Sequence, residues 1–182
     1  MKTIIIILTT ILGMQCFAAN DQQYVQCEVK PGVYGKNNLS AVKSPMLPVK
    51  IRELEASQPV DSTFLLGEIE PSSFAIHDNY EVRVSGFVSK PGNNWAKNEA
   101  VLLLTAELLQ IVRGKSSKRL LSAAVAGSNS VANEAQLAAV KSGRLKTTHH
   151  LYNSDYLLAK EEGLKIPKEM LFEASVECRL VR

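Results

Sequence analysis

Two cysteines near opposite ends of the chain are the feature that most limits how this sequence can fold. Each lies where apolar and polar residues alternate, as in a β-strand with one buried face. Cys27 shares a face with Val25 and Val29, and Cys178 shares a face with Val176. Both thiols should therefore face a core. We predict a disulfide bond between Cys27 and Cys178 that joins the first and last strands, with two free buried thiols as the alternative.

The N-terminal segment has the pattern of a secretory signal peptide. Lys2 precedes an apolar run at residues 4–12, and the small residues Cys16 and Ala18 occupy the −3 and −1 positions of a cleavage site after Ala18. The run is shorter than the roughly 20 residues that a membrane span needs. A buried N-terminal strand or helix and a lipidated Cys16 are the alternatives. We expect residues 1–18 to be cleaved and the protein to be periplasmic or secreted, a compartment in which a disulfide persists.

Residues 19–182 form a chain of 164 residues, which suits a single β-rich domain. Lys2 is the only charged residue in the first 18, so its removal lowers the formal net charge from +3 to +2. Such a small charge gives no reason to expect nucleic-acid binding. After the signal peptide no apolar stretch is long enough to be a transmembrane helix, and we expect none.

Short alternating segments separated by turn-forming residues predict a mainly β fold. The clearest of them is Tyr80–Val88, in which Val82, Val84 and Val88 share one face. The remaining expectations are strands at Val49–Leu54 and Phe64–Ile69, a loop at Pro31–Pro48, a break at Pro71–Ser73, and short helices at Val131–Lys141 and Ser154–Glu162 that end near Gly143 and Gly163.

The segment Glu99–Arg113 carries conflicting signals. It is rich in good helix formers, and its polar residues cluster on a period of 3.6. However, Gly114–Lys118 has the composition of a hairpin tip that would join two strands, Leu108–Val112 and Leu120–Ala126. Agreement with the neighbouring strand-like segments favours the strand pair. We predict an antiparallel β-sandwich with one or two short helices, and the alternative is an α+β fold with a helix at about 98–113.

The sequence contains no recognisable catalytic or metal-binding motif. Neither a GxSxG elbow nor an SxxK, HExxH or glycine-rich phosphate loop occurs. His149 and His150 are adjacent and would point to opposite faces of a strand, so they should not share a metal ion. His77 stands beside Asp78, a common surface arrangement. We therefore predict no catalytic residue, no metal and no cofactor.

The best candidate for ligand binding is the loop that contains the only tryptophan. Trp95 would supply a large apolar surface, while Asn93 and Asn94 would supply hydrogen bonds. The alternative is that Trp95 folds back to cover the edge of the core.

Two functions from different classes agree with these observations. The first is an exported, non-catalytic binding or accessory protein of the cell envelope, whose partner is an unknown envelope protein or glycan. The second is a secreted hydrolase that uses carboxylates with His77 or His149. Convergence of several histidines and acidic residues in one pocket would favour the hydrolase, and their dispersal would favour the binding protein.

Overall fold

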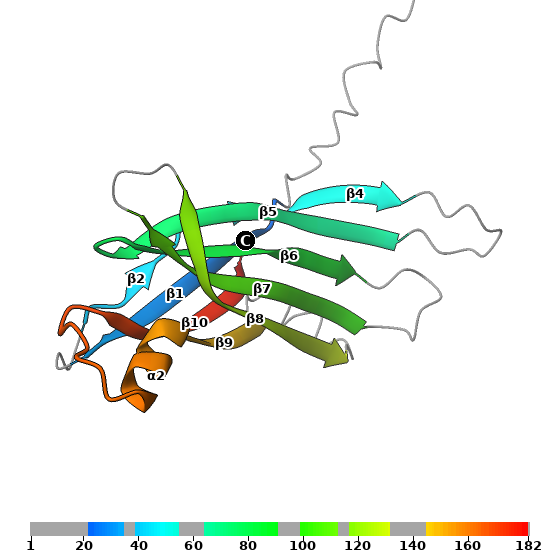
Figure 1. Cartoon of the computed structure of the whole chain (residues 1–182). Coiled ribbons are helices and arrows are strands. Elements are labelled where there is room, and N and C mark those ends of the chain that lie inside the picture. Colours follow the sequence, from blue (N-terminus) through cyan, green and yellow to red (C-terminus); the bar gives the residue numbers. More distant parts are fainter. Residues whose placement is uncertain are drawn as a thin grey trace, which may run out of the picture.

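The computed structural model shows a mainly β protein whose strands form two antiparallel sheets on either side of a shared core (Figure 1). The predicted sandwich is confirmed. The residues that the structure describes are 22–34, 39–54, 64–90, 99–112, 117–131 and 145–181.

The first sheet, called sheet A here, places the first and last strands side by side. They pair from Tyr24 opposite Val181 to Val33 opposite Leu171. The strand order is β2 (Val42–Lys43), β1 (Tyr24–Val33), β10 (Leu171–Val181) and β9 (Lys146–Tyr152), and β3 (Leu47–Pro48) also pairs with β1.

The second sheet, sheet B, is a meander in which each strand pairs with the next along the chain. The order is β4 (Lys50–Leu54), β5 (Phe64–His77), β6 (Tyr80–Lys90), β7 (Glu99–Ile111) and β8 (Lys118–Val131). The strand pair around 114–118 is therefore confirmed, and the helix alternative for 98–113 is wrong. Leu102, Leu104 and Leu108 all point into the core on the two-residue period of β7, while Glu107 pairs with Arg83 on the outer face. Pairing on both sides of β7 outweighs the local helix propensity.

Two of the expected breaks are absent. Strand β5 continues through Pro71–Ser73, because the register shifts between Ile69 and Ser72 and this irregularity accommodates the proline. Strand β1 extends through Pro31 to Val33, and the short strands β2 and β3 lie within the expected loop at Pro31–Pro48. A proline fits in β1 here because its missing N–H faces away from β10.

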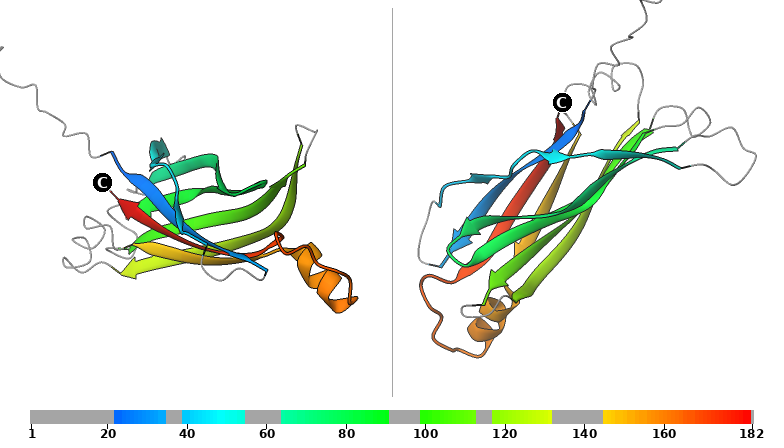
Figure 2. Two further views of the ribbon diagram at one scale, coloured as in Figure 1. Left: turned by 90° about the vertical axis from the view of Figure 1, so that its left-hand side faces the viewer. Right: turned by 90° about the horizontal axis from the view of Figure 1, so that it is seen from above.

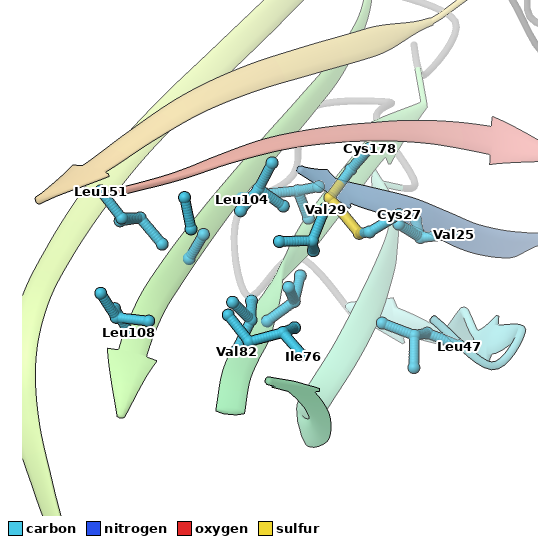
Figure 3. Close-up of a cluster of buried hydrophobic side chains, with 14 of the residues drawn as sticks. Val25, Cys27, Val29, Leu47, Ile76, Val82, Leu104, Leu108, Leu151 and Cys178 are labelled. Carbon is cyan, nitrogen blue, oxygen red and sulfur yellow. A yellow bond between two sulfur atoms is a disulfide. The ribbon is translucent and has the colours of Figure 1, made fainter. Parts of the chain in front are cut away.

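The disulfide joins the neighbouring strands β1 and β10 on the buried face of sheet A. Cys27 lies directly opposite Cys178, with their sulfur atoms 2.07 Å and their Cα atoms 4.0 Å apart (Figure 3). The backbone of Cys27 bonds instead to Ser44: its N–H donates to Ser44 Oγ at 2.9 Å, and its carbonyl accepts from the Ser44 N–H at 2.8 Å. The two cysteines are thus a non-hydrogen-bonded pair, the kind that brings opposite side chains closest. The predicted disulfide is confirmed.

The two sheets are linked at one flank by the chain itself. It passes from β3 in sheet A to β4 in sheet B at Val49, whose N–H donates to the Gln23 carbonyl at 2.9 Å. Val49 is buried against Gly67, where a Cβ would lie 2.3 Å from Val49 Cγ1. Glycine at 67 therefore provides the space that this corner needs.

At the other flank β8 and β9 lie side by side, although they belong to different sheets (Figure 2). The Tyr152 N–H donates to Ser122 Oγ at 3.4 Å, and Ser154 Oγ donates to the Leu121 carbonyl at 3.3 Å. The core is therefore bounded on both flanks.

The predicted helix near the C-terminus is confirmed as α2 (Ser154–Glu161), which lies at one end of the sheets (Figure 1). Asn153 caps it by accepting a hydrogen bond from the Asp155 N–H, and Gly163 follows with a φ of 66°. The other expected helix does not begin at Val131, which is the last residue of β8; residues 132–144 lie outside the described part. Within the described part, no helix is long and apolar enough to cross a bilayer.

Candidate functional site

The outer face of sheet A carries a hollow of about 560 Å³ at the end nearest α2. Its floor belongs to β1, β10 and β9, which are consecutive neighbours in the sheet. Its polar and aromatic lining comprises Lys30, His150, Tyr152, Phe172, Glu173 and Ser175, and Gly32 and Leu39 also border it.

The strand register arranges these side chains in two rows across the sheet. In the row nearer α2, Glu173 lies between Tyr152 on β9 and Gly32 on β1. In the next row, Ser175 lies between His150 and Lys30.

The same register sets how close these side chains come. Backbone groups of even-numbered β10 residues bond toward β9, as the Leu180 N–H does with the Leu145 carbonyl at 2.9 Å. The odd-numbered residues Glu173 and Ser175 are thus non-hydrogen-bonded partners of the β9 residues Tyr152 and His150, so these cross-strand side chains are closely spaced.

The hollow is open because residue 32 has no side chain. A Cβ at Gly32 would lie 2.6 Å from Glu173 Cγ and 3.0 Å from Phe172 Cζ. The Glu173 side chain therefore lies across Gly32, beside the edge of the Phe172 ring. A larger residue at position 32 would displace both groups and reshape this end of the hollow.

Phe172, which lines the hollow, belongs to a group of packed aromatic rings near α2. The rings of Tyr156 and Phe172 have centroids 5.3 Å apart, and those of Tyr34 and Tyr156 are 6.1 Å apart. Tyr152 lines the hollow from β9 and is 49 % exposed. Aromatic rings that remain accessible beside polar groups are a usual feature of ligand sites.

The two charged residues that line the hollow, Lys30 and Glu173, lie in different rows of the sheet. The ammonium group of Lys30 is 3.9 Å from the Glu28 carboxylate, and the Lys30 side chain is 72 % exposed. Glu173 lies in the other row, among the aromatic residues. The site thus offers a carboxylate next to aromatic surface, with hydroxyl and imidazole groups one row away.

The structure separates the three histidines. His149 points into the core, whereas His150 lies on the outer face and lines the hollow. His77 lies at the β5–β6 turn, where its Nε2 is 3.3 Å from Asp78 Oδ2 without the alignment of a hydrogen bond. Over the described ranges, no three histidine, cysteine or acidic side chains are grouped so that they could hold a metal ion.

The loop that was predicted to bind a ligand cannot be compared with this hollow. Trp95, Asn93 and Asn94 fall in residues 91–98, outside the described part, so that prediction stays a prediction. The strand ends that flank the loop, Lys90 and Glu99, lie at the end of sheet B opposite the end where Arg119 of β8 pairs with Asp155 of α2.

Sequence reasoning missed the hollow because its walls come from distant parts of the chain. Lys30 and Ser175 become neighbours only through the pairing of β1 with β10. The sequence did contain one signal for the hollow. The polar residues that alternate with buried residues around each cysteine form the outer face of sheet A. Once the disulfide is accepted, opposing the two strands at Cys27 and Cys178 places Gly32 opposite Glu173.

Comparison with known proteins adds no assignment, because no protein family, curated protein or solved structure matches this chain significantly.

Proposed function

We propose that this chain is an exported, non-catalytic binding or accessory protein of the cell envelope, with the hollow on the outer face of sheet A as its ligand site. The observation that carries the proposal is the hollow itself. Its volume of about 560 Å³ falls within the roughly 300–1,000 Å³ typical of small-molecule sites. Its walls combine aromatic rings with a few polar groups, which is how such sites obtain both affinity and orientation.

Export is supported by the signal-peptide pattern of residues 1–18 and by the Cys27–Cys178 disulfide. Disulfides persist mainly in oxidising compartments such as the periplasm and the extracellular space. The two observations together support a periplasmic or secreted location.

The dispersal of the histidines favours binding over hydrolysis. A hydrolase that used His77 or His149 would need carboxylates gathered around one of these rings. His149 instead faces two backbone carbonyl groups inside the core, and His77 lies at a turn beside Asp78. The one histidine in the hollow is His150, which the hydrolase hypothesis did not use.

The proposal is tested with the mature chain, residues 19–182, immobilised and exposed to an envelope extract. Bound proteins and glycans are identified by mass spectrometry for wild type, Tyr152→Ala and Thr148→Ala. Thr148 lies on the same strand and face as His150 and does not line the hollow, so its variant is the matched control.

We expect a ligand that Thr148→Ala retains and Tyr152→Ala loses. A ligand that both variants retain equally would place recognition elsewhere and contradict the hollow as the binding site. A Trp95→Ala arm tests the other predicted site: selective loss in this variant would move the site to the 91–98 loop.

A further inference from the structure

We infer that the hollow binds an organic ammonium group, held between the Glu173 carboxylate and the ring of Tyr152. This inference rests on the proposed function and specifies the chemistry of its ligand.

Glu173 differs in its electrostatic surroundings from five other glutamates of the described strands. It has no cationic side chain within ion-pair distance among the residues that the structure describes. In contrast, five other strand glutamates form ion pairs, namely Glu28 with Lys30, Glu70 with Lys50, Glu81 with Lys118, Glu107 with Arg83 and Glu177 with Lys146. Unlike these five carboxylates, the carboxylate of Glu173 is available to a cationic group of a ligand.

The surroundings of Glu173 suit an organic cation better than a metal ion. The Glu173 Cγ lies over Gly32, and the exposed Tyr152 is the closely spaced cross-strand partner of Glu173. Aromatic faces attract ammonium groups through the ring quadrupole, and a nearby carboxylate adds a charge-assisted hydrogen bond or ion pair. A metal ion would need further oxygen or nitrogen ligands, and the described residues do not group them here.

Lys30, the other charged residue of the hollow, does not form an ion pair with Glu173. Lys30 lies in the neighbouring row opposite Ser175, and its ammonium group is directed to within 3.9 Å of Glu28. Its own charge is therefore partly compensated and largely solvated. The hydroxyl of Ser175 and the imidazole of His150 lie where they could bond to polar atoms on the rest of the ligand.

An ammonium group could come from a free amine or from a lysine side chain of a polypeptide. Both present the same chemistry to Glu173, so the experiment uses a probe for each. Choline and cadaverine represent free amines, and N-acetyl-lysine methylamide represents a lysine within a chain. The uncharged control is 3,3-dimethylbutan-1-ol, which has the shape of choline without its charge.

The experiment is a titration of the ¹⁵N-labelled mature protein followed by NMR. We expect the ammonium probes to shift the amides of Tyr152, Glu173 and Ser175, and the neutral alcohol to leave them unchanged. Glu173→Gln should weaken Kd about tenfold or more, since it removes a charge-assisted contact. Glu177→Gln is the control on the same strand and face, outside the hollow, and should keep Kd within about twofold.

Two outcomes would overturn the inference: equal binding of choline and its neutral analogue, or an unchanged Kd in Glu173→Gln. The failure of this inference can be separated from that of the proposed function. If a ligand from the envelope extract shifts the Tyr152 and Ser175 amides while the ammonium probes do not, the ammonium chemistry is wrong and the binding site stands. If neither shifts them, both are wrong. Tighter binding of the lysine amide than of the free amines would indicate a polypeptide source, and the reverse would indicate a small amine.

Discussion

The Nε2 atom of His149 lies 3.1 Å from the carbonyl oxygen of Leu104, so a side chain of sheet A is bonded to the backbone of sheet B. His149 is 2 % exposed, and its Nδ1 is 3.4 Å from the Val176 carbonyl. Both neighbours are acceptors, and the shorter contact places the donated proton on Nε2. This bond holds β9 against β7 in the interior of the sandwich.

Replacing His149 with phenylalanine should destabilise the fold while keeping a ring in the same space. The substitution removes a buried hydrogen bond between the two sheets, and such a bond contributes about 0.5–1.5 kcal/mol. Chemical denaturation gives the free energy of unfolding. The control is His150→Phe on the outer face, where we expect a change within about 0.5 kcal/mol. Equal effects of the two substitutions would show that the bond between the sheets contributes nothing.

Reduction of the Cys27–Cys178 disulfide should lower the free energy of unfolding by about 2–5 kcal/mol. The bond joins residues 151 positions apart, so it restricts most of the unfolded chain. Denaturation with and without reductant measures this loss, and a Cys27→Ala/Cys178→Val double variant should not respond to reductant. Two alkylatable thiols in the native, unreduced mature protein would disprove the bond.

Gly86→Ala should be strongly destabilising, because a steric clash adds to the roughly 1–3 kcal/mol that an unfavourable backbone conformation costs. Gly86 has a φ of 153°, and a Cβ there would lie 2.1 Å from the Leu103 carbonyl oxygen. The control is Gly163→Ala after α2: its φ is also positive, at 66°, but no atom lies within 4 Å of the added Cβ. Thermal unfolding should separate the two, and similar midpoints would show that the β6–β7 contact relaxes easily.

Tyr80→Phe should reduce the loss of stability at alkaline pH. Burial raises the pKa of Tyr80 above 10.0, despite opposing contributions from the Leu171 backbone and the Gln110 side chain. The neutral phenol is thus favoured in the folded state. This contribution to stability is present below the unfolded pKa near 10 and is lost as pH rises through the folded pKa. Urea denaturation from pH 8 to 11 should show a steeper decline for wild type than for Tyr80→Phe. Parallel curves would contradict the assignment.

The local pattern of the sequence was enough to predict which segments form strands around the cysteines and which residues of each strand are buried. Cys27 and Cys178 face inward because their neighbours at two-residue spacing are apolar, and the disulfide follows from that shared orientation. The helix at 154–161 was predictable for a similar reason, because the glycine that follows it acts through local backbone geometry. Short-range periodicity and turn chemistry carry this information.

The tertiary structure decided the rest, because strand pairing depends on residues far apart in the chain. Hydrogen bonding on both sides made 99–111 a strand despite its helix-forming composition. A shift of register allows β5 to continue through Pro71. The two adjacent histidines differ in role for the same reason: the packing of β9 against β7 gives His149 a backbone partner, while His150 joins the hollow. The hollow itself exists only where Gly32, Glu173 and Tyr152 meet across three strands. Their alternation along the chain determined that they share an outer face, and only the register of the folded sheet made them neighbours.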